Sequence, residues 1–238
     1  MATILVKQST GERAVFFERS TATEPEFLDT HKQLIGSAYI MHINGRHRQL
    51  MRSAMAVAKE VGTIISLDGG AQRYDEDMKP ITEASHIVIV ARDYAEKYTG
   101  TTNLKEACRI IHERGACIAG VTDGANGSYF VWPDGTFYRC EPFTQSTVVD
   151  TTGAGDSFHG AFLANLVHTI NHMKGQDTTS TTKHDRASIH AVELLKACAH
   201  SDLEKAAIFA SAVASLNTQG IGGRSPLPTL KSVQELIG

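Results

Sequence analysis

The residues from Asp150 to Phe158 read DTTGAGDSF, a segment whose glycines and carboxylates could bind and transfer a phosphate group. It follows the apolar run 147–149, so we expect a strand, a glycine-rich turn and a helix that continues to about His168. Gly153 and Gly155 let the backbone turn tightly enough for successive amides to converge on an anion at the positive end of that helix. The segment therefore predicts a phosphate-binding turn.

Asp156 stands beside the anion that this turn would bind. The amides of Ala154, Gly155 and Asp156 would stabilise charge on a transferring phosphoryl group, whereas a carboxylate used only for phosphate binding would repel it. The carboxylate is better explained as a base that accepts the proton of an alcohol during transfer. The alternative is structural, because an Asp commonly caps a helix where Gly-x-Gly-Asp occurs alone.

Short apolar strands alternate with longer amphipathic segments from residue 37 onward. The expected strands are residues 38–43, 63–67, 87–90 and 118–122. Helices are expected between them, including residues 47–61 and 104–113. Alternation of this kind predicts an α/β fold with a mostly parallel central sheet and helices on both faces.

Two pairs of β-prone runs are each joined by turn residues. Residues 2–7 and 13–18 flank a polar segment that contains glycine, and residues 128–132 and 136–140 flank Pro133-Asp134-Gly135. Each pair predicts a β-hairpin.

The last third of the chain contains one more clear helix. It is expected over about residues 203–218, with Ser201 and Glu204 at the spacing of a capping box. Residues 171–184 are rich in Thr, Ser, Lys and His without apolar periodicity, so they predict a surface loop.

Composition limits the partners. The 238 residues carry 23 Lys and Arg against 26 Asp and Glu, and this net charge of -3 gives no general attraction to nucleic acid or anionic membrane. The four cysteines are widely spaced, with no pair at zinc-ligand spacing. The first residues lack the basic and apolar regions of a signal peptide. These observations predict a cytoplasmic protein with reduced cysteines and without a nucleic-acid or membrane partner, in which any phosphate site is local.

DTTGAGDSF, followed by the small residues of the next helical turns, resembles the second signature of the PfkB family, which includes ribokinase, ketohexokinase and adenosine kinase. The resemblance covers roughly residues 1–230. It implies a ribokinase-like three-layer α/β/α fold and an ATP-dependent kinase that phosphorylates a hydroxyl of a sugar or sugar-like molecule with Mg²⁺. In these terms residues 1–20 are a lid-remnant β-hairpin, and residues 21–238 are the catalytic and nucleotide-binding domain.

The resemblance also implies residues that hold the nucleotide and a monovalent cation such as K⁺. The residues that match the family's Thr-x-Gly-x-x-Gly nucleotide loop are Thr122, Gly124 and Gly127. Asn217 is a candidate neighbour of adenine, and Asp150 and Thr152 are candidate cation ligands. Each has a structural alternative: a glycine turn between strands, a helix that ends in glycine, and an Asp that caps a turn.

Two loops that follow expected strands could bind the acceptor. Gly45 and Arg46 follow the first of these strands, and Asp68 and Gly69 follow the next, with Arg73 close behind. Ligands collect at such carboxyl ends in open α/β sheets. Polar residues after strands are also what ordinary loops contain.

The sequence departs from the family pattern in two respects. Counting back from Gly100, the family's Asn-x-x-Glu, which orders magnesium and phosphate, falls on Ala91 and Tyr94. Asp93 and Glu96 share that spacing, but a shift of two residues changes the face of a helix by more than half a turn. The family's sugar-binding Asp, its Gly-Gly-Asn segment and its earlier lid strands have no counterpart in the sequence.

Two functions fit these observations. The first is an ATP-dependent carbohydrate kinase with Asp156 as its base. The second is a non-catalytic nucleotide-binding protein, a truncated or pseudokinase form of the family. Since an isolated hairpin is marginally stable, the first hairpin should pair with another subunit, as in a homodimer, or with the body of the domain.

Overall fold

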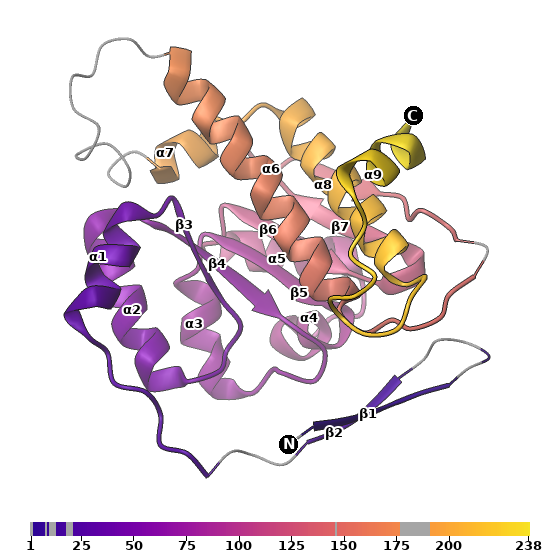
Figure 1. The fold of residues 1–238 in the computed structure, drawn as a ribbon. Helices are drawn as coiled ribbons and strands as arrows, with labels where there is room; N and C mark the ends of the chain where they lie inside the picture. The colour runs from indigo at the N-terminus through magenta and orange to yellow at the C-terminus, as the bar shows by residue number, and fades with distance from the viewer. Residues whose placement is uncertain (1, 8, 10–12, 18–20, 146, 177–190) are drawn as a thin grey trace.

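A six-stranded sheet ordered β3-β4-β5-β6-β7-β8 lies at the centre of the described part of the chain (Figure 1). The computed structural model describes residues 2–7, 9, 13–17, 21–145, 147–176 and 191–238. The strands are β3 (Ile40–Ile43), β4 (Ile64–Gly69), β5 (Ile87–Ala91), β6 (Ile118–Thr122), β7 (Ser128–Val131) and β8 (Phe137–Cys140). The first four are parallel, and β7 and β8 continue the sheet antiparallel. The mostly parallel sheet that the sequence predicts is confirmed.

Helices cover both faces of this sheet (Figure 1). On one face lie α1 (Asp29–Ser37), α2 (Arg48–Val61), α3 (Lys79–Glu83), α4 (Arg92–Thr99) and α5 (Leu104–Glu113). On the other face lie α6 (Ala154–Gln176), α7 (Ala191–Lys196), α8 (His200–Asn217) and α9 (Leu230–Ile237). Right-handed crossovers between parallel strands in sequential order put every connecting helix on one face, so the chain after β8 covers the other.

The described residues form two hydrophobic cores, one on each face of the sheet. The alternation of side chains along the strands explains why there are two. In β5, Ile87 and Ile89 pack against the α6 side, whereas Val88 and Val90 pack against the α4 and α5 side. All four side chains have no exposed surface. Successive side chains of a strand point to opposite faces, and a strand buried on both faces is apolar throughout.

Gly120 of β6 lets α6 pack closely onto the sheet. A Cβ at this position would lie 2.7 Å from a ring carbon of Phe130. Without that Cβ, Phe130 stacks on Phe162 of α6 at a centroid distance of 5.7 Å and an angle of 7°. Both aromatic side chains are fully buried, so α6 is held rigidly over the middle strands.

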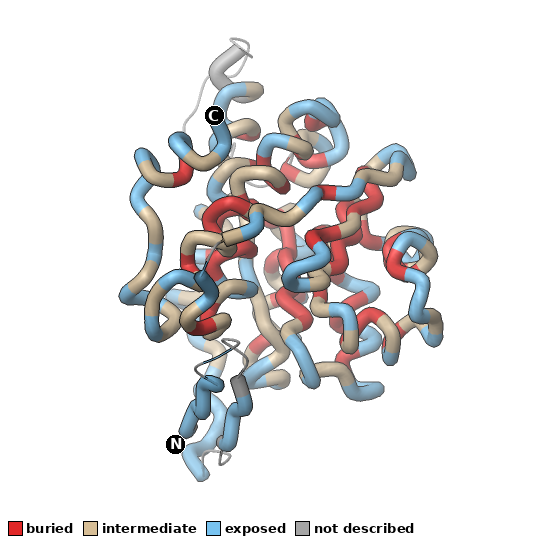
Figure 2. The backbone as a smooth tube through the Cα atoms, turned by 90° about the vertical axis from the view of Figure 1, so that its right-hand side faces the viewer, coloured by how far each residue is buried: buried red, intermediate tan, exposed pale blue. Residues whose placement is uncertain are grey.

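The N-terminal hairpin forms a separate two-stranded sheet of β1 (Ala2–Val6) and β2 (Arg13–Phe17), paired antiparallel as predicted. It extends away from the six-stranded sheet, and its described surface is exposed (Figure 2). Large apolar side chains on it are 42 to 60% exposed at Ile4, Leu5, Val15 and Phe16. Residues 10–12, which belong to the segment that resembles the family's lid, lie outside the described residues.

Three expectations for the second half of the chain are wrong. Residues 147–149 form no strand, because the amides of Val149 and Asp150 donate to the carbonyl of Thr218 at 2.8 and 3.2 Å instead of pairing in the sheet. The helix after them continues to Gln176, well into the predicted loop, whose residues 177–184 lie outside the described residues.

The predicted capping box is the third expectation that is wrong. Helix α8 begins at His200 after an N-cap at Ala199, so Ser201 and Glu204 lie inside the helix. Apolar packing of the first turn through the fully buried Leu203 accounts for this earlier start better than the capping signal does. Within the described residues, no helix combines the length and apolarity needed to cross a bilayer.

We expect the chain to self-associate through the hairpin, because contiguous exposed apolar side chains on a two-stranded sheet favour pairing with another surface. The double variant Leu5→Ser, Phe16→Ser should shift the particle size measured by light scattering toward a single chain. Ile237→Ser, which changes a side chain that is 41% exposed at the other end of the protein, should not. A wild-type protein that already scatters as a single chain would contradict pairing between copies.

Candidate active site

The start of α6 is fixed by a close contact between two glycines. Gly153 has a φ of +80°, and a Cβ on it would lie 2.5 Å from Cα of Gly223 and 2.9 Å from its carbonyl oxygen. Only glycine adopts that backbone angle without strain, and only glycine leaves room for the facing loop. The sequence DTTGAGDSF therefore forms a turn that is locked against the loop after α8.

The turn leaves backbone amides free to bind an anion. The amide of Ala154 donates to the Thr151 carbonyl over 3.3 Å, and that of Ser157 donates to the Gly153 carbonyl over 2.8 Å. The amides of Gly155 and Asp156 belong to the first turn of α6, whose N–H groups have no carbonyl partner within the helix. These two amides at the positive helix end are the best placed for a phosphate.

Asp150 ties this turn to the loop after α8. Its Oδ1 accepts the amide of Thr152 at 2.8 Å, and its Oδ2 accepts the amide of Gly222 at 2.9 Å, although the residue is only 3% exposed. The hydroxyl oxygen of Thr152 is buried without a hydrogen-bond partner among the described residues. A buried hydroxyl oxygen without a partner beside a carboxylate offers two oxygen ligands, so the two residues fit a small cation.

Asn217 is the last residue of α8 and is fully buried. Its side-chain nitrogen donates to the carbonyl of Thr152 over 3.1 Å, which joins the end of α8 to the glycine turn. With no exposed surface, it stands behind the turn as a support for the backbone.

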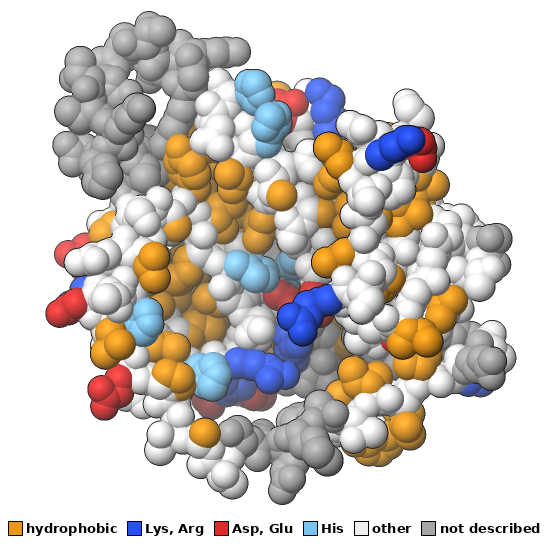
Figure 3. Space-filling view, viewed as in Figure 1, with side chains coloured by type: hydrophobic (Ala, Val, Ile, Leu, Met, Phe, Trp, Pro, Cys, Tyr) orange, Lys and Arg blue, Asp and Glu red, His pale blue; other side chains and the backbone are white. Residues whose placement is uncertain are grey.

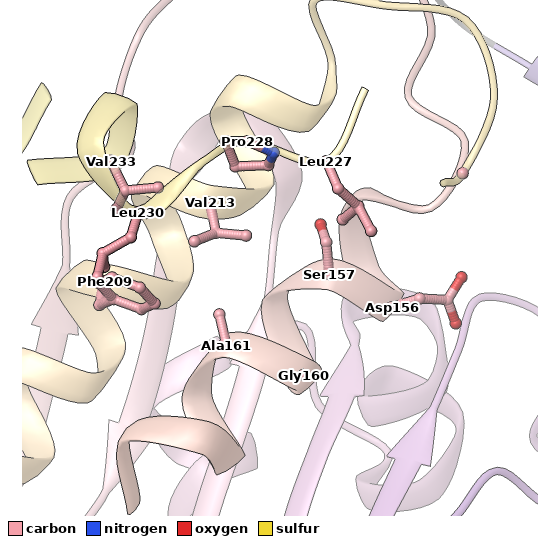
Figure 4. A pocket seen from close by; sticks show the side chains of 11 residues that line it. Asp156, Ser157, Gly160, Ala161, Phe209, Val213, Leu227, Pro228, Leu230 and Val233 are labelled. Carbon is pink, nitrogen blue, oxygen red and sulfur yellow. The ribbon is translucent and has the colours of Figure 1, made fainter. Parts of the chain in front are cut away.

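A pocket of about 430 Å³ opens beside the first turns of α6 (Figure 4). Gly160 and Ala161 form a flat floor, and the apolar walls come from α8, α9 and the chain between them: Phe209, Val213, Leu227, Pro228, Leu230 and Val233. The carboxylate of Asp156 points away from this apolar wall (Figure 4). The pocket suits a flat apolar ring, and Asp156 lines its rim with the carboxylate turned outward.

The predicted nucleotide loop follows β6 at the carboxyl edge of the sheet. Gly127 has a φ of +90°, and a Cβ on it would lie 2.3 Å from the carbonyl oxygen of Cys140, so the loop is built around a required glycine. The hydroxyl of Thr122 donates to the carbonyl of Val90 over a long 3.4 Å. Gly124 begins a single 3₁₀ turn, Gly124–Asn126. These residues form a rigid turn beside the strand ends.

Arg92 and Asp123 form an ion pair that sequence reasoning did not identify. Two guanidinium nitrogens of Arg92, which follows β5, donate to the two carboxylate oxygens of Asp123, which follows β6. The side chain of Asp123 is 9% exposed, whereas that of Arg92 is 45% exposed. The pair fixes the nucleotide loop to the neighbouring strand end.

Asp68 and Arg73 lie at the end of β4. Arg73 lies 3.5 Å from Oδ2 of Asp68, whose side chain is 9% exposed. A Cβ at Gly70 would lie 3.0 Å from the Arg73 guanidinium, and a Cβ at Gly69 would lie 2.4 Å from Val90. The two glycines thus let the loop return closely enough for the arginine to cover the carboxylate.

His159 joins Asp68 to the first turn of α6. It follows Asp156 by three residues on the helix, and its Nε2 lies 3.8 Å from Oδ1 of Asp68. The ring of His42, from β3, lies 5.6 Å from that of His159. Sequence reasoning missed both histidines; the spacing of three residues between Asp156 and His159 was the one available signal.

Gly45 and Arg46 lie after β3, farther along the same edge. Gly45 has a φ of +78°, and a Cβ on it would lie 2.8 Å from the methyl carbon of Met78. Arg46 lines a second pocket of about 480 Å³ together with His42. Basic, acidic and histidine side chains gather at the centre of this face (Figure 3). The structure therefore brings the predicted acceptor loops to the edge that Asp156 faces.

The two positions at which the family orders magnesium do not supply ligands here. Ala91 has no side-chain oxygen, and the fully buried Tyr94 shares a 2.7 Å hydrogen bond with Thr82. Asp93 accepts the amide of Gln72, and Glu96 lies 3.9 Å from Arg92. These positions do not fit a magnesium site, and within the described residues no group of three His, Cys, Asp or Glu could hold a metal ion.

Comparison with known proteins identifies the family. The model of the pfkB family of carbohydrate kinases matches residues 1–230. Probable fructokinase-5 of Arabidopsis thaliana is 26% identical over 245 residues, which cover 95% of this chain and 67% of the relative. The chain spans only 31% and 29% of the lengths of two other curated relatives, a cytidine kinase of Thermococcus kodakarensis and a bifunctional ribokinase/ribose-5-phosphate isomerase A of Fructilactobacillus sanfranciscensis.

Solved structures show the fold. Ribokinase from Giardia lamblia superposes with a TM-score of 0.76 at 17% identity, over 99% of this chain and 70% of that one. Arabidopsis thaliana ribokinase, solved with ribose and ATP, superposes with a TM-score of 0.70 at 22% identity, over 99% of this chain and 68% of that one. The fold is ribokinase-like, as the sequence signature implied.

The glycine contact predicts a difference between two alanine variants of the same turn. Gly153→Ala should lower the free energy of unfolding by roughly 1–3 kcal/mol, since it forces a positive φ on alanine and drives its Cβ into the Gly223 backbone. Gly155→Ala should leave it unchanged or raise it by about 0.5–1 kcal/mol, because Gly155 is helical and has open space around its Cβ position. Urea unfolding measures both, and equal stabilities would contradict the contact.

Proposed function

The chain belongs to the pfkB family of carbohydrate kinases, and on that basis we propose that it transfers the γ-phosphoryl group of ATP to a hydroxyl of a sugar or sugar-like molecule. The observation that carries the proposal is the start of α6, where a locked glycine turn presents free amides and Asp156 faces the strand ends. An anion site and a base within one helical turn are what phosphoryl transfer to an alcohol requires.

The nucleotide would lie across the glycine turn and the loop after β6. The apolar pocket over Gly160 and Ala161 has the shape for adenine, and the amides of Gly155 and Asp156 would face its phosphates. Thr122, Gly124 and Gly127 would approach the other side of the nucleotide, held by the pair of Arg92 and Asp123. Asn217 would act through the backbone of Thr152 and not on adenine directly.

The chemical step follows from this arrangement. The acceptor hydroxyl oxygen attacks the γ-phosphorus, its proton passes to the carboxylate of Asp156, and the bond to the β-phosphate oxygen breaks, leaving ADP. The amides of Gly155 and Asp156 would form the anion hole and stabilise the charge, with Gly153 setting the turn and the amide of Ala154 donating to the Thr151 carbonyl. Because the transition state is loose, position matters more than basicity for the carboxylate.

The acceptor would bind at the ends of β3 and β4. Asp68, which is buried and covered by Arg73, could accept a hydroxyl hydrogen, and Gly45 and Arg46 would line the opposite wall. A monovalent cation held by Asp150 and Thr152 would stabilise the glycine turn electrostatically. Magnesium would reach the site with the nucleotide phosphates, and no step depends on a protein ligand for it.

A second candidate is nucleotide binding without turnover. The observation that favours it is the absence of magnesium-ordering oxygens at Ala91 and Tyr94, where other members of the family provide an amide and a carboxylate. The anion turn does not depend on those two positions. Nucleotide affinity and turnover therefore have to be measured separately.

The nucleotide site predicts binding of ATP or ADP in the presence of magnesium, measured by calorimetry. Gly155→Ala should weaken binding by about tenfold or more without lowering stability, because its new Cβ would occupy the space that a phosphate approaches. The absence of binding heat with either nucleotide at millimolar concentration would contradict the proposed nucleotide site. Unchanged nucleotide affinity in Gly155→Ala would show that the phosphate does not bind at this turn.

The assignment of Asp156 as the general base predicts the effect of Asp156→Asn. Turnover should fall by roughly 100- to 10,000-fold, the usual contribution of a general base, while nucleotide affinity stays the same or improves because a charge that repels phosphate is removed. A sugar panel run first identifies the acceptor.

Asp202→Asn is the matched control, since Asp202 lies in the first turn of α8 and forms an ion pair with the neighbouring Lys205 at the surface. It should leave turnover unchanged. A loss below about threefold in Asp156→Asn contradicts the base, whereas nucleotide binding without turnover of any sugar favours the second candidate.

A further inference from the structure

His159 occupies an unusual place for a titratable side chain. It lies one turn into α6, directly over the sheet, and its side chain is 4% exposed. Nδ1 lies 2.9 Å from the carbonyl oxygen of Gly155, and Nε2 lies 3.0 Å from the carbonyl oxygen of Ile89. The imidazole therefore bridges the anion turn and β5 through both of its nitrogens.

Two carbonyl oxygens demand two donors. A carbonyl oxygen only accepts hydrogen bonds, and a neutral imidazole has one N–H and one lone pair. In either neutral tautomer of His159, one ring nitrogen carries a lone pair that faces a buried carbonyl oxygen. That carbonyl then lacks the hydrogen bond from the ring, which costs folding free energy. The imidazolium form alone donates at both positions.

The charged groups around the ring favour this form. Oδ1 of Asp68 lies 3.8 Å from Nε2, and Asp156 lies on the same helix one turn earlier. Two basic groups lie near them: Arg73, which contacts the other oxygen of Asp68, and His42. On balance the pKa of His42 is lowered, chiefly by its burial and then by the charge of His159, against an opposing effect of Asp68 and Asp156. Its Nδ1 lies 3.2 Å from the hydroxyl oxygen of Ser66.

We propose that His159 is an imidazolium that acts as a positioning residue, holding Asp68 and the first turn of α6 in the geometry that acceptor binding needs. Its two N–H groups fasten Gly155 to Ile89, and its charge faces the carboxylate of Asp68. The structural part stands on this geometry alone, whereas the role in acceptor binding rests on the proposed function.

Nitrogen-15 NMR of the histidine rings tests the protonation directly. The wild-type spectrum at pH 6 to 7 should contain a buried ring with two slowly exchanging N–H protons and both nitrogens at imidazolium shifts, and this signal should vanish in His159→Gln. His172→Gln, an exposed position on the same helix, should leave it in place. A single ring N–H, or a nitrogen at a neutral shift, overturns the proposal whether or not the protein is a kinase.

Steady-state kinetics test the positioning role. His159→Gln can offer an amide to one carbonyl but neither the second donor nor the charge, so the acceptor KM should rise about tenfold, with a smaller change in nucleotide KM. An unchanged acceptor KM overturns the role even if the ring is charged. His172→Gln should behave as the wild type.

Amide hydrogen exchange separates this proposal from the kinase assignment. If the wild type phosphorylates no acceptor, His159→Gln should still accelerate exchange at residues 67–70 and 155–159, because the bridge to β4 and β5 is lost. Unchanged exchange at both segments overturns the positioning role, whereas faster exchange supports it and leaves the failure with the kinase assignment alone.

Discussion

The close approach of Gly153 to Gly223 is the constraint on which the site depends. It brings the turn before α6 against the loop after α8, and the buried Asp150 then joins the two by accepting an amide from each. Because the first residue of a helix sets its direction, this junction decides where the amides of α6 point and where Asp156 faces. A side chain on Gly153 would separate the two loops, and the glycine turn, the apolar pocket beside α6 and the surroundings of Asp150 would change together.

The sheet supplies the rigid counterpart of that junction. Apolar alternation in the middle strands buries both faces, and Gly120 lets Phe130 and Phe162 stack so that α6 cannot slide along the sheet. The carboxyl ends of the parallel strands then meet the start of α6 at one edge. Sites on rigid elements hold their geometry better than sites on free loops. The loops at this edge are correspondingly fixed, one by the pair of Arg92 and Asp123 and another by Arg73.

Local patterns in the sequence predicted most of this frame. The bounds of β6 and α5 agree with the expected residues 118–122 and 104–113, because each is short, strongly periodic and clearly delimited. The run 147–149 was misread as a strand because its amides are satisfied by Thr218, about seventy residues away, which no local pattern reveals. His159 was missed for the same reason. Its helix is local, but its partners Ile89 and Asp68 come from other strands.

The position of Tyr94 shows why binding and turnover are separable in this fold. Burial raises its pKa to about 12, its hydroxyl is held by Thr82, and its ring packs edge-on against Tyr74, so the residue belongs to the core. A position at which the family resemblance implies a magnesium-ordering carboxylate is thus occupied here by a tyrosine of the core. The glycine turn before α6 does not depend on Tyr94, because Gly153 fixes the position of its amides and lies on the opposite face of the sheet. Phosphoryl transfer depends chiefly on position and electrostatic stabilisation. Under the proposed function, the glycine turn and the Asp156 carboxylate would therefore suffice for nucleotide binding, and the rate of transfer would be decided by how the phosphates are ordered.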